Sequence, residues 1–342
     1  MSASAAVPTP SACRALPAAT ALRRGGAAVG TAPALLLGGA ILLWGANWPV
    51  MKLGLGHVSP LWFSALRFAT GAACLFAWQA ARGTVWRPRA ADLPVIASIG
   101  LLQMMLFTAL GALAMTHLPA GRSAILSYTT PIWVVPVAVL VFGERIASRQ
   151  WAGIGLAALG VAILFNPHAI DWRDGTVLGA HAMLLAASAA WAACILHLRY
   201  GGSEASAAQL APWQMLLAAA VLLPLALALE GPFTGDGTTT FWACLIFVGP
   251  IATAFGFCAV NAASRLVPAS LMSTLMLAVP VTGLAIATAT LHETPGPDLI
   301  LGALAIILGI AASAVPARIA SKGGRRLSEK DVAETRLGTR RD

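Results

Sequence analysis

The sequence predicts an all-α integral membrane protein with ten transmembrane helices arranged as two inverted five-helix repeats. Of its 342 residues, 58% are hydrophobic and only 10% are charged, whereas soluble domains carry roughly a quarter charged residues. The hydrophobic residues fall in ten runs, each near the ~20 residues that a membrane-spanning helix needs. A membrane barrel would instead alternate apolar and polar residues in short strands.

The first run begins near Pro33, after a tail at 1–32 that is rich in Ala, Pro, Ser and Gly. This tail lacks the continuous apolar stretch of a signal peptide, and we expect it to be disordered and cytoplasmic. The charged segment 318–342 is expected to be a cytoplasmic C-terminal tail. The expected spans between the tails are 33–53, 61–81, 93–115, 121–142, 149–166, 176–198, 209–229, 241–263, 268–291 and 297–317.

Basic residues predict the orientation, because loops rich in Lys and Arg stay in the cytoplasm. With the N-terminus inside, the outer segments hold Lys52, Arg122 and Arg173. Both termini are therefore expected on the cytoplasmic side of a plasma (inner) membrane, which requires an even number of spans. The inner loops alone then hold seven basic residues, namely Arg82, Arg87, Arg89, Arg145, Arg149, Arg199 and Arg265.

The second half of the chain repeats the first, which gives the halves 33–166 and 176–317 with five spans each. Five is odd, so the second half enters the membrane with the opposite polarity. Inverted repeats are typical of alternating-access transporters, whose substrate sites lie near the midplane. The matching pairs are Pro131 with Pro280, Glu144 with Glu293 and Gly153 with Gly302 at an offset of 149, and Trp44 with Trp191 at an offset of 147.

These residues also resemble a known family. The first span reads LLWGANWPVMKLGL from Leu42, the second carries Leu66-Arg67-Phe68, and each half has the proline, Glu and Gly just described. This pattern is similar to the EamA-type family of the drug/metabolite transporter superfamily, over nearly the whole chain outside the tails. The resemblance implies ten helices, cytoplasmic termini and a central cavity away from the fifth and tenth helices. Family members usually export amino acids or other small metabolites, and some carry drugs or nucleobase-like compounds.

Aromatic and polar residues within the spans are candidates for the lining of a substrate cavity. Trp44 and Trp48 are four residues apart and share a helix face, near Asn47, and Trp191 is the counterpart of Trp44. They would form a stacking or cation–π wall, or else anchor or pack the helices. The other uncharged candidates, which could instead make bonds between helices, are Gln103, Tyr128, Asn261 and Ser273.

Arg67 lies within the second span, where a charge is costly unless it faces a cavity or a partner. It would attract a substrate carboxylate, or else extend to the interface or bond backbone carbonyls. The seventh span has Ala218 near the expected counterpart position, so the Arg is not duplicated.

Two further pairs concern conformational change. Pro131 and Pro280 fall near mid-span, where each removes a helix hydrogen bond, and they serve as static kinks or as hinges for alternating access. Glu144 and Glu293 fall at helix ends, where they cap or pair, or act as gates.

The charged residues also narrow the mechanism. Every Asp and Glu lies in a loop, in a tail or at a helix end, which favours facilitated diffusion or exchange over carboxylate-based proton coupling. The net charge of +9 is spread over tails and short loops, which disfavours nucleic-acid binding. No Cys/His spacing indicates a metal site, and no cofactor is expected.

The sequence thus predicts a secondary transporter that exports amino acids or other small metabolites or drugs across the plasma membrane by alternating access. Its expected partners are a small-molecule substrate and the lipid bilayer. An alternative is a carrier for sugars or nucleobase-like solutes; nucleotide diphosphates would need more cations than Arg67. A non-transporting scaffold remains a second alternative. An enzyme is not expected, because no catalytic constellation accompanies His168, Asp171 and Asp174.

Overall fold

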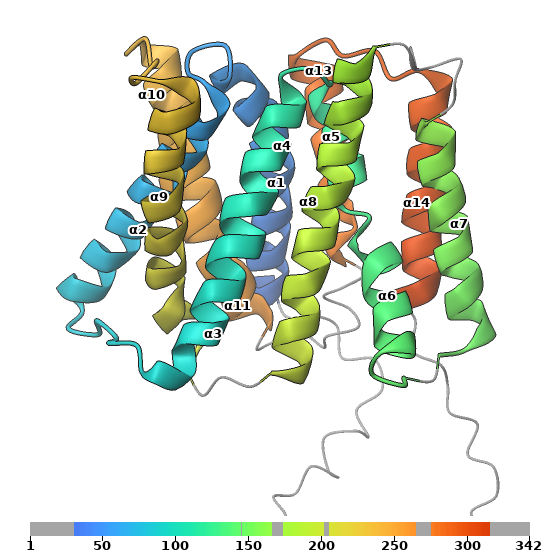
Figure 1. Cartoon of the computed structure of the whole chain (residues 1–342), viewed down its shortest axis with the longest axis horizontal. Coiled ribbons are helices and arrows are strands. Elements are labelled where there is room, and N and C mark those ends of the chain that lie inside the picture. Colours follow the sequence, from blue (N-terminus) through green and yellow to red (C-terminus); the bar gives the residue numbers. More distant parts are fainter. Residues whose placement is uncertain (1–30, 145, 166–173, 202–204, 265–274, 315–342) are drawn as a thin grey trace, which may run out of the picture.

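The structure of the chain is a computed structural model that describes residues 31–144, 146–165, 174–201, 205–264 and 275–314. Within these ranges the chain is helical and forms no strand (Figure 1). The charged C-terminal tail and nearly all of the N-terminal tail lie outside the described residues. The all-α prediction is therefore confirmed over the part of the chain that forms the bundle.

Each expected apolar run holds a helix, and six helices are long and apolar enough to cross a membrane by length and composition. The protein is therefore a multi-pass membrane protein. The first half contains α1 (Thr31–Gly54), α2 (Pro60–Ala81), η2 (Ala90–Asp92), α3 (Leu93–Ala97), η3 (Ser98–Leu106), α4 (Phe107–Met115), α5 (Ala120–Ser127), α6 (Thr130–Leu140) and α7 (Ser148–Leu164). The second contains α8 (Gly175–Tyr200), α9 (Ala207–Glu230), α10 (Thr239–Ile246), η4 (Phe247–Phe255), α11 (Gly256–Ser264), α13 (Ala278–Thr290) and α14 (Pro297–Ala314).

Several helices begin where a side chain can accept a bond from an unpaired backbone N–H. The Asp174 carboxylate accepts from the backbone N–H of Thr176 at 2.9 Å before α8, and the Thr238 hydroxyl accepts from the backbone N–H of Phe241 at 3.2 Å in α10. Such N-caps stabilise a helix by about 1 kcal/mol. Local sequence therefore sets these helix starts.

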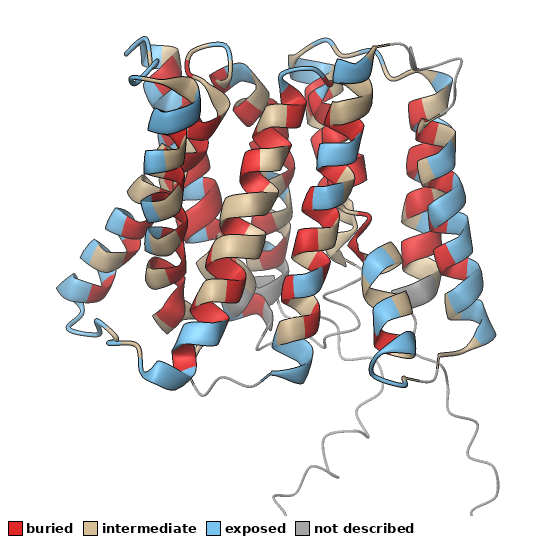
Figure 2. Cartoon of the chain, in the orientation of Figure 1, coloured by how far each residue is buried: buried red, intermediate tan, exposed pale blue. Residues whose placement is uncertain are grey.

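The outer surface of the bundle is apolar. Leu140 is 81% exposed and Leu229 is 69% exposed, and Figure 2 shows exposed residues on the outward side of most helices. Exposed apolar area on this scale marks a membrane contact. Such a surface is suited to contact with a lipid bilayer rather than with water.

The two halves pack in matching pairs of helices. The α2 helix packs along α9, and α7 packs along α14. In the same way α1 lies against α13, while α8 lies against α5 and α6. The α7–α14 pair stands at one side of the bundle in Figure 1.

A π-helical segment lies at the same repeat position in each half. The η3 segment spans Ser98–Leu106, and η4 spans Phe247–Phe255, so that both have nine residues and start 149 residues apart. The η3 segment packs on α9, and η4 packs on α2. Each half thus contributes a π-helical segment that contacts the other half. Such segments are frequent at functional sites.

The fourth span is interrupted, which corrects one expectation about Pro131. Tyr128 and Thr129 separate α5 from α6, and Pro131 lies in the first turn of α6. A first-turn proline gives up no helical hydrogen bond, so Pro131 does not kink a continuous helix. In the turn between the two helices, the Thr129 hydroxyl donates to the carbonyl of Leu126 at 2.7 Å. Pro280 is likewise the third residue of α13.

Candidate functional site

A cavity of about 120 Å³ lies where the two halves meet. It has room for several water molecules or a small solute. Its walls come from α1, α2, η3, α4 and the α5–α6 break in the first half, and from α8, η4 and α11 in the second. None of the described residues that line it comes from α7 or α14.

Most of the predicted cavity residues lie together around this space. Asn261 belongs to α11, but its side chain is outside the described part of the chain, as is Ser273. The residues that the structure brings together are Trp44, Asn47, Trp48, Arg67, Gln103, Tyr128 and Trp191.

Aromatic side chains form one wall of the cavity. The ring of Trp191 lies edge-on to Phe107 at 5.2 Å and to Tyr128 at 5.4 Å between centroids. Trp48 continues the row, with its centroid 6.4 Å from that of Phe107. Edge-to-face contacts of this kind hold rings in fixed orientations. The wall is therefore a rigid apolar surface for a flat or apolar solute.

Trp44 lies differently from its counterpart Trp191. Its indole N–H donates to the backbone carbonyl of Ala252 in η4 at 2.9 Å. A π-helical segment shifts the backbone bonding by one residue, and the side chain of Thr253 likewise donates to the carbonyl of Val248 at 2.6 Å. Side chains thus bond the η4 carbonyls beside the cavity.

Arg67 lines the cavity from α2 and reaches across to the second half. Its Nε donates to the hydroxyl of Thr253 at 2.6 Å, and one Nη1 hydrogen points to the sulfur of Met51 at 3.0 Å. Its guanidinium carbon is 5.6 Å from the centroid of Phe68. Within the described residues, no carboxylate forms an ion pair with Arg67.

The neutral polar groups of the cavity are only partly bonded. The amide N–H of Asn47 points to the sulfur of Met51 at 3.3 Å, while its Oδ1 has no protein partner in the described part of the chain. The Gln103 carbonyl accepts a weak bond from the thiol of Cys194 at 3.7 Å. These groups can exchange bonds with a solute at little cost.

The packing of two glycines identifies Gln214, one helical turn before Ala218, as the counterpart of Arg67 in the second half. A Cβ on Gly249 would lie 3.0 Å from the Arg67 carbonyl, and a Cβ on Gly100 would lie 3.0 Å from the Gln214 carbonyl. The two glycines are 149 residues apart and mark equivalent positions. Gln214 is fully buried, and neither polar atom of its side chain has a partner among the described residues.

At the upper end of Figure 1 the halves are joined by carboxylates that bind helix N-termini. Glu293 accepts from the backbone N–H groups of Ala120 at 2.6 Å and Gly121 at 3.0 Å, at the start of α5. Glu230 accepts from the backbone N–H of Leu61 at 2.9 Å, at the start of α2. Negative groups at helix N-termini also interact favourably with the helix dipole.

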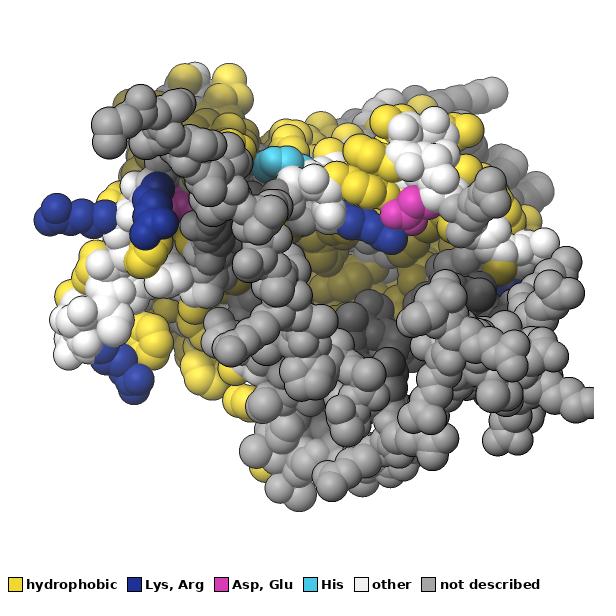
Figure 3. Space-filling view, turned by 90° about the horizontal axis from the view of Figure 1, so that it is seen from below, with side chains coloured by type: hydrophobic (Ala, Val, Ile, Leu, Met, Phe, Trp, Pro, Cys, Tyr) yellow, Lys and Arg dark blue, Asp and Glu magenta, His cyan; other side chains and the backbone are white. Residues whose placement is uncertain are grey.

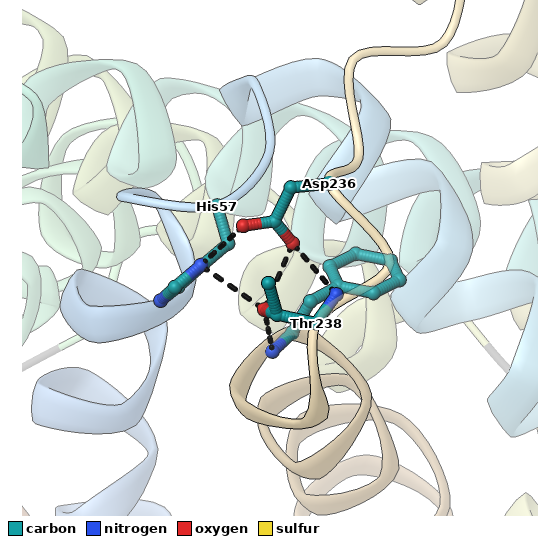
Figure 4. Close-up of polar contacts among 4 residues, drawn as sticks. His57, Asp236 and Thr238 are labelled. Atoms are coloured by element: carbon teal, nitrogen blue, oxygen red, sulfur yellow. Dashed lines mark hydrogen bonds and ion pairs between the residues drawn. The ribbon is translucent and has the colours of Figure 1, made fainter.

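The same end carries a polar cluster of His57, Asp236 and Thr238 (Figure 4). His57 Nδ1 lies 2.6 Å from an Asp236 carboxylate oxygen, and the Thr238 hydroxyl donates to the other oxygen at 2.9 Å. The hydrogen bond from His57, with others from Thr238, lowers the pKa of Asp236 below its ordinary value. The cluster ties the α1–α2 connection to the α9–α10 connection.

The opposite end is more basic. Its described basic residues include Arg82, Arg87 and Arg89 in the α2–α3 connection. Figure 3 shows Lys and Arg side chains at this end and a hollow beside them in which hydrophobic side chains lie deeper. Glu144 lies here and pairs with Arg199 at 2.8 Å, and it accepts from the hydroxyl of Tyr200 at 2.5 Å. Glu144 and Glu293 thus bond different kinds of partner.

Sequence reasoning missed several lining residues. Met51 and Thr253 are the contacts of Arg67, and Phe107 joins the aromatic wall. Thr253 falls on Met104 at the repeat offset of 149, and both line the cavity. Neither residue was predicted from the sequence, but the repeat register would have led from either one to the other.

The sequence profile of the EamA-like transporter family matches this chain twice, over residues 31–166 and 178–315. The chain belongs to the EamA-like transporter family. The resemblance seen in the sequence is thereby confirmed. The protein is a membrane transporter, and its partner is a small-molecule substrate.

Named relatives agree with this assignment over most of their length. The chain is 25% identical over 269 residues to "Uncharacterized transporter YoaV" of Bacillus subtilis (strain 168), covering 79% of this chain and 92% of that protein. It is 29% identical to a "Probable terminal-alkyne amino-acid exporter" of Streptantibioticus cattleyicolor, covering 79% and 89%. A "Probable amino-acid metabolite efflux pump" of Salmonella typhimurium is 28% identical, covering 79% and 90%.

The fold also has a solved counterpart. A crystal structure that is 22% identical superposes with a TM-score of 0.60 and covers 86% of this chain and 100% of that one. At this identity the likeness concerns the fold alone.

Proposed function

We propose that this EamA-family transporter exports amino acids or other small metabolites or drugs across the plasma membrane by alternating access. The observation that carries this proposal is the cavity at the junction of the halves. Seven of the residues that line it were predicted from the sequence as cavity residues. Two relatives, named as a probable amino-acid exporter and a probable amino-acid metabolite efflux pump, support the substrate class.

The proposed architecture is ten spans in two inverted halves, 33–166 and 176–317, with both termini in the cytoplasm. The matched packing of helices supports the repeat. In Figure 1 the α2–α3 connection is at the lower end and the equivalent α9–α10 connection is at the upper end, as inversion requires. The greater number of described basic residues at the lower end supports a cytoplasmic assignment there.

The proposed cycle opens and closes the two ends in turn. Glu293 and Glu230 join the halves at the upper end and would have to release the helix N-termini of α5 and α2 for that end to open. Pro131 and Pro280 each lie near the start of a helix in a lining or adjacent span. We propose them as hinges, and Glu144 and Glu293 as groups that open and close the ends.

A second candidate substrate class follows from the aromatic wall. Trp48, Phe107 and Trp191 form a flat apolar surface, which suits nucleobase-like rings or the apolar faces of sugars. The purified transporter reconstituted into liposomes tests both classes. Liposomes loaded with amino acids, carboxylates, sugars and nucleobases should lose one class selectively, with no dependence on a pH gradient.

A Trp44→Ala variant tests whether the cavity carries the flux. It should be folded by size-exclusion chromatography and should slow loss of the transported class at least severalfold. A folded, inserted wild type that releases no solute would instead favour a scaffold role. For topology, reporter fusions at Gly83 and at the C-terminus should report the cytoplasm. A periplasmic signal at the C-terminus would contradict the ten-span proposal.

A further inference from the structure

The charge of the cavity points to a class of substrate, an inference that rests on the proposed transport function. Arg67 carries the one formal charge among the described residues that line the cavity. None of the chain's 13 acidic residues is among them. The described lining of the cavity is therefore cationic.

Arg67 has donors to spare. A guanidinium has five N–H donors, and the contacts of Arg67 within the described residues are the Thr253 hydroxyl at 2.6 Å and the Met51 sulfur at 3.0 Å. Sulfur is a weak acceptor, and a buried charge is stable only when it is paired and hydrogen-bonded. A carboxylate can take two parallel N–H bonds from a guanidinium. A substrate carboxylate would supply the counter-ion that the described residues around Arg67 do not.

The rest of the cavity suits an apolar body, and its described lining gives an ammonium group no negatively charged partner. Trp48, Phe107 and Trp191 present ring surfaces and no charge. Aromatic faces attract cations, but an ammonium group would enter beside Arg67, a like charge. Among the described lining residues its hydrogen bonds would go to neutral acceptors such as Asn47 Oδ1. Like charges in a region of low dielectric repel strongly.

We propose that the preferred substrate is an apolar or aromatic monocarboxylate with no free ammonium group, bound through Arg67. Zwitterionic amino acids would be carried less well than their deaminated or N-acylated analogues, and cationic amines least. No acidic side chain lies deep in a span to carry a compensating proton. If the substrate crosses alone, without a proton or an exchanged anion, each transport event moves one negative charge. An inside-negative potential then drives export at about 2.3 kcal/mol per 100 mV, a roughly fifty-fold concentration ratio.

Three solutes that each join a phenyl ring to the charged group through two carbon atoms isolate the effect of charge. 3-Phenylpropionate is an anion, phenylalanine a zwitterion and phenethylamine a cation at pH 7. Their efflux from proteoliposomes, with the leak from protein-free liposomes subtracted, should be fastest for 3-phenylpropionate, by tenfold or more over phenethylamine. A valinomycin-imposed inside-negative potential should speed loss of the anion.

Variants of Arg67 and of its counterpart Gln214 test whether Arg67 causes the preference for the anion. Arg67→Gln should lower protein-dependent efflux of 3-phenylpropionate at least tenfold and leave that of phenethylamine unchanged or higher, while Arg67→Lys should retain part of the anion flux. Gln214→Leu is the matched control, because Gln214 holds the equivalent place outside the cavity lining. It should leave the order of the three solutes unchanged.

The outcomes separate this inference from the transport proposal. Phenylalanine or phenethylamine crossing as fast as 3-phenylpropionate, or anion efflux that Arg67→Gln does not alter, would overturn the anion preference while leaving a transporter. If the protein releases other solutes from a mixture but releases none of these three, the anion preference is likewise overturned and the transport proposal stands. If folded protein releases no solute at all, the transport proposal itself fails.

Discussion

Arg67 and Gln214 hold equivalent places in the two halves but have opposite surroundings. Arg67 lines the cavity and reaches Thr253 of the other half. Gln214 is buried away from the cavity lining, and its amide has no partner among the described residues. The helices around the two residues pack alike, so the repeat builds a symmetric frame while the charge is placed on one side only.

The same contrast holds at other equivalent pairs. Glu293 binds backbone N–H groups of α5, whereas Glu144 pairs with an exposed arginine. The Trp44 indole donates to a backbone carbonyl, while Trp191 contacts aromatic rings. Symmetry in packing therefore does not imply symmetry in chemistry, because each side chain meets different neighbours in a single conformation.

The largest difference in stability between equivalent substitutions is expected at the glycines where η3 and η4 meet the opposite half. A Cβ at Gly249 would lie 2.2 Å from the Thr70 hydroxyl oxygen, whereas one at Gly100 would lie 3.0 Å from the Gln214 carbonyl. Overpacking costs about 1–3 kcal/mol, so Gly249→Ala should lower the Tm of the purified protein more than Gly100→Ala. Equal losses would mean that the two contacts are more alike than the geometry indicates.

The next largest difference in stability is expected between substitutions of the two glutamates, Glu293 and Glu144. Glu293 makes two charge-assisted bonds to backbone N–H groups, and bonds to charged groups contribute about 1.5–3 kcal/mol. The side chain of Arg199, the partner of Glu144, is 53% exposed, and such surface pairs contribute below about 1 kcal/mol. Thermal unfolding should therefore show a clearly larger loss of Tm for Glu293→Ala than for Glu144→Ala.

Gln214→Leu should raise the stability of the protein, whereas the substitutions above lower it. It removes a buried amide whose two polar atoms have no partner among the described residues, and an unsatisfied buried group costs about 1–3 kcal/mol. A modest rise in Tm is expected, by about 1 kcal/mol of stability. A fall in Tm would show that Gln214 does bond something, such as a buried water.

The smallest effect is expected at the His57–Asp236 contact. The pKa of Asp236 is lowered in the folded protein from an ordinary 3.8, so its stabilising contribution is present above the ordinary pKa and is lost as pH falls through the lowered pKa. Asp236→Asn should lower Tm slightly at pH 7, and the difference from wild type should vanish in that acidic range. A difference that grows on acidification would contradict this sign.

Much of the frame could be predicted from the sequence. The apolar runs gave helices because a chain in lipid must satisfy its backbone bonds internally. The repeat register located Trp191 from Trp44, and both line the cavity. The interruption of the fourth span was not foreseen, because Pro131 was expected to bend a helix that in fact begins there.

The sequence by itself determined where helices form, that they lie in a membrane and that two halves repeat, because these follow from local hydrophobicity and spacing. Only the tertiary structure decided that Arg67 meets Thr253, 186 residues away, that Gln214 is its counterpart and that acidic groups are absent from the described cavity lining. Those contacts depend on how helices from different halves turn toward one another. The rotation of each apolar helix about its axis is set by packing across the whole bundle, and it cannot be predicted from hydrophobic periodicity alone.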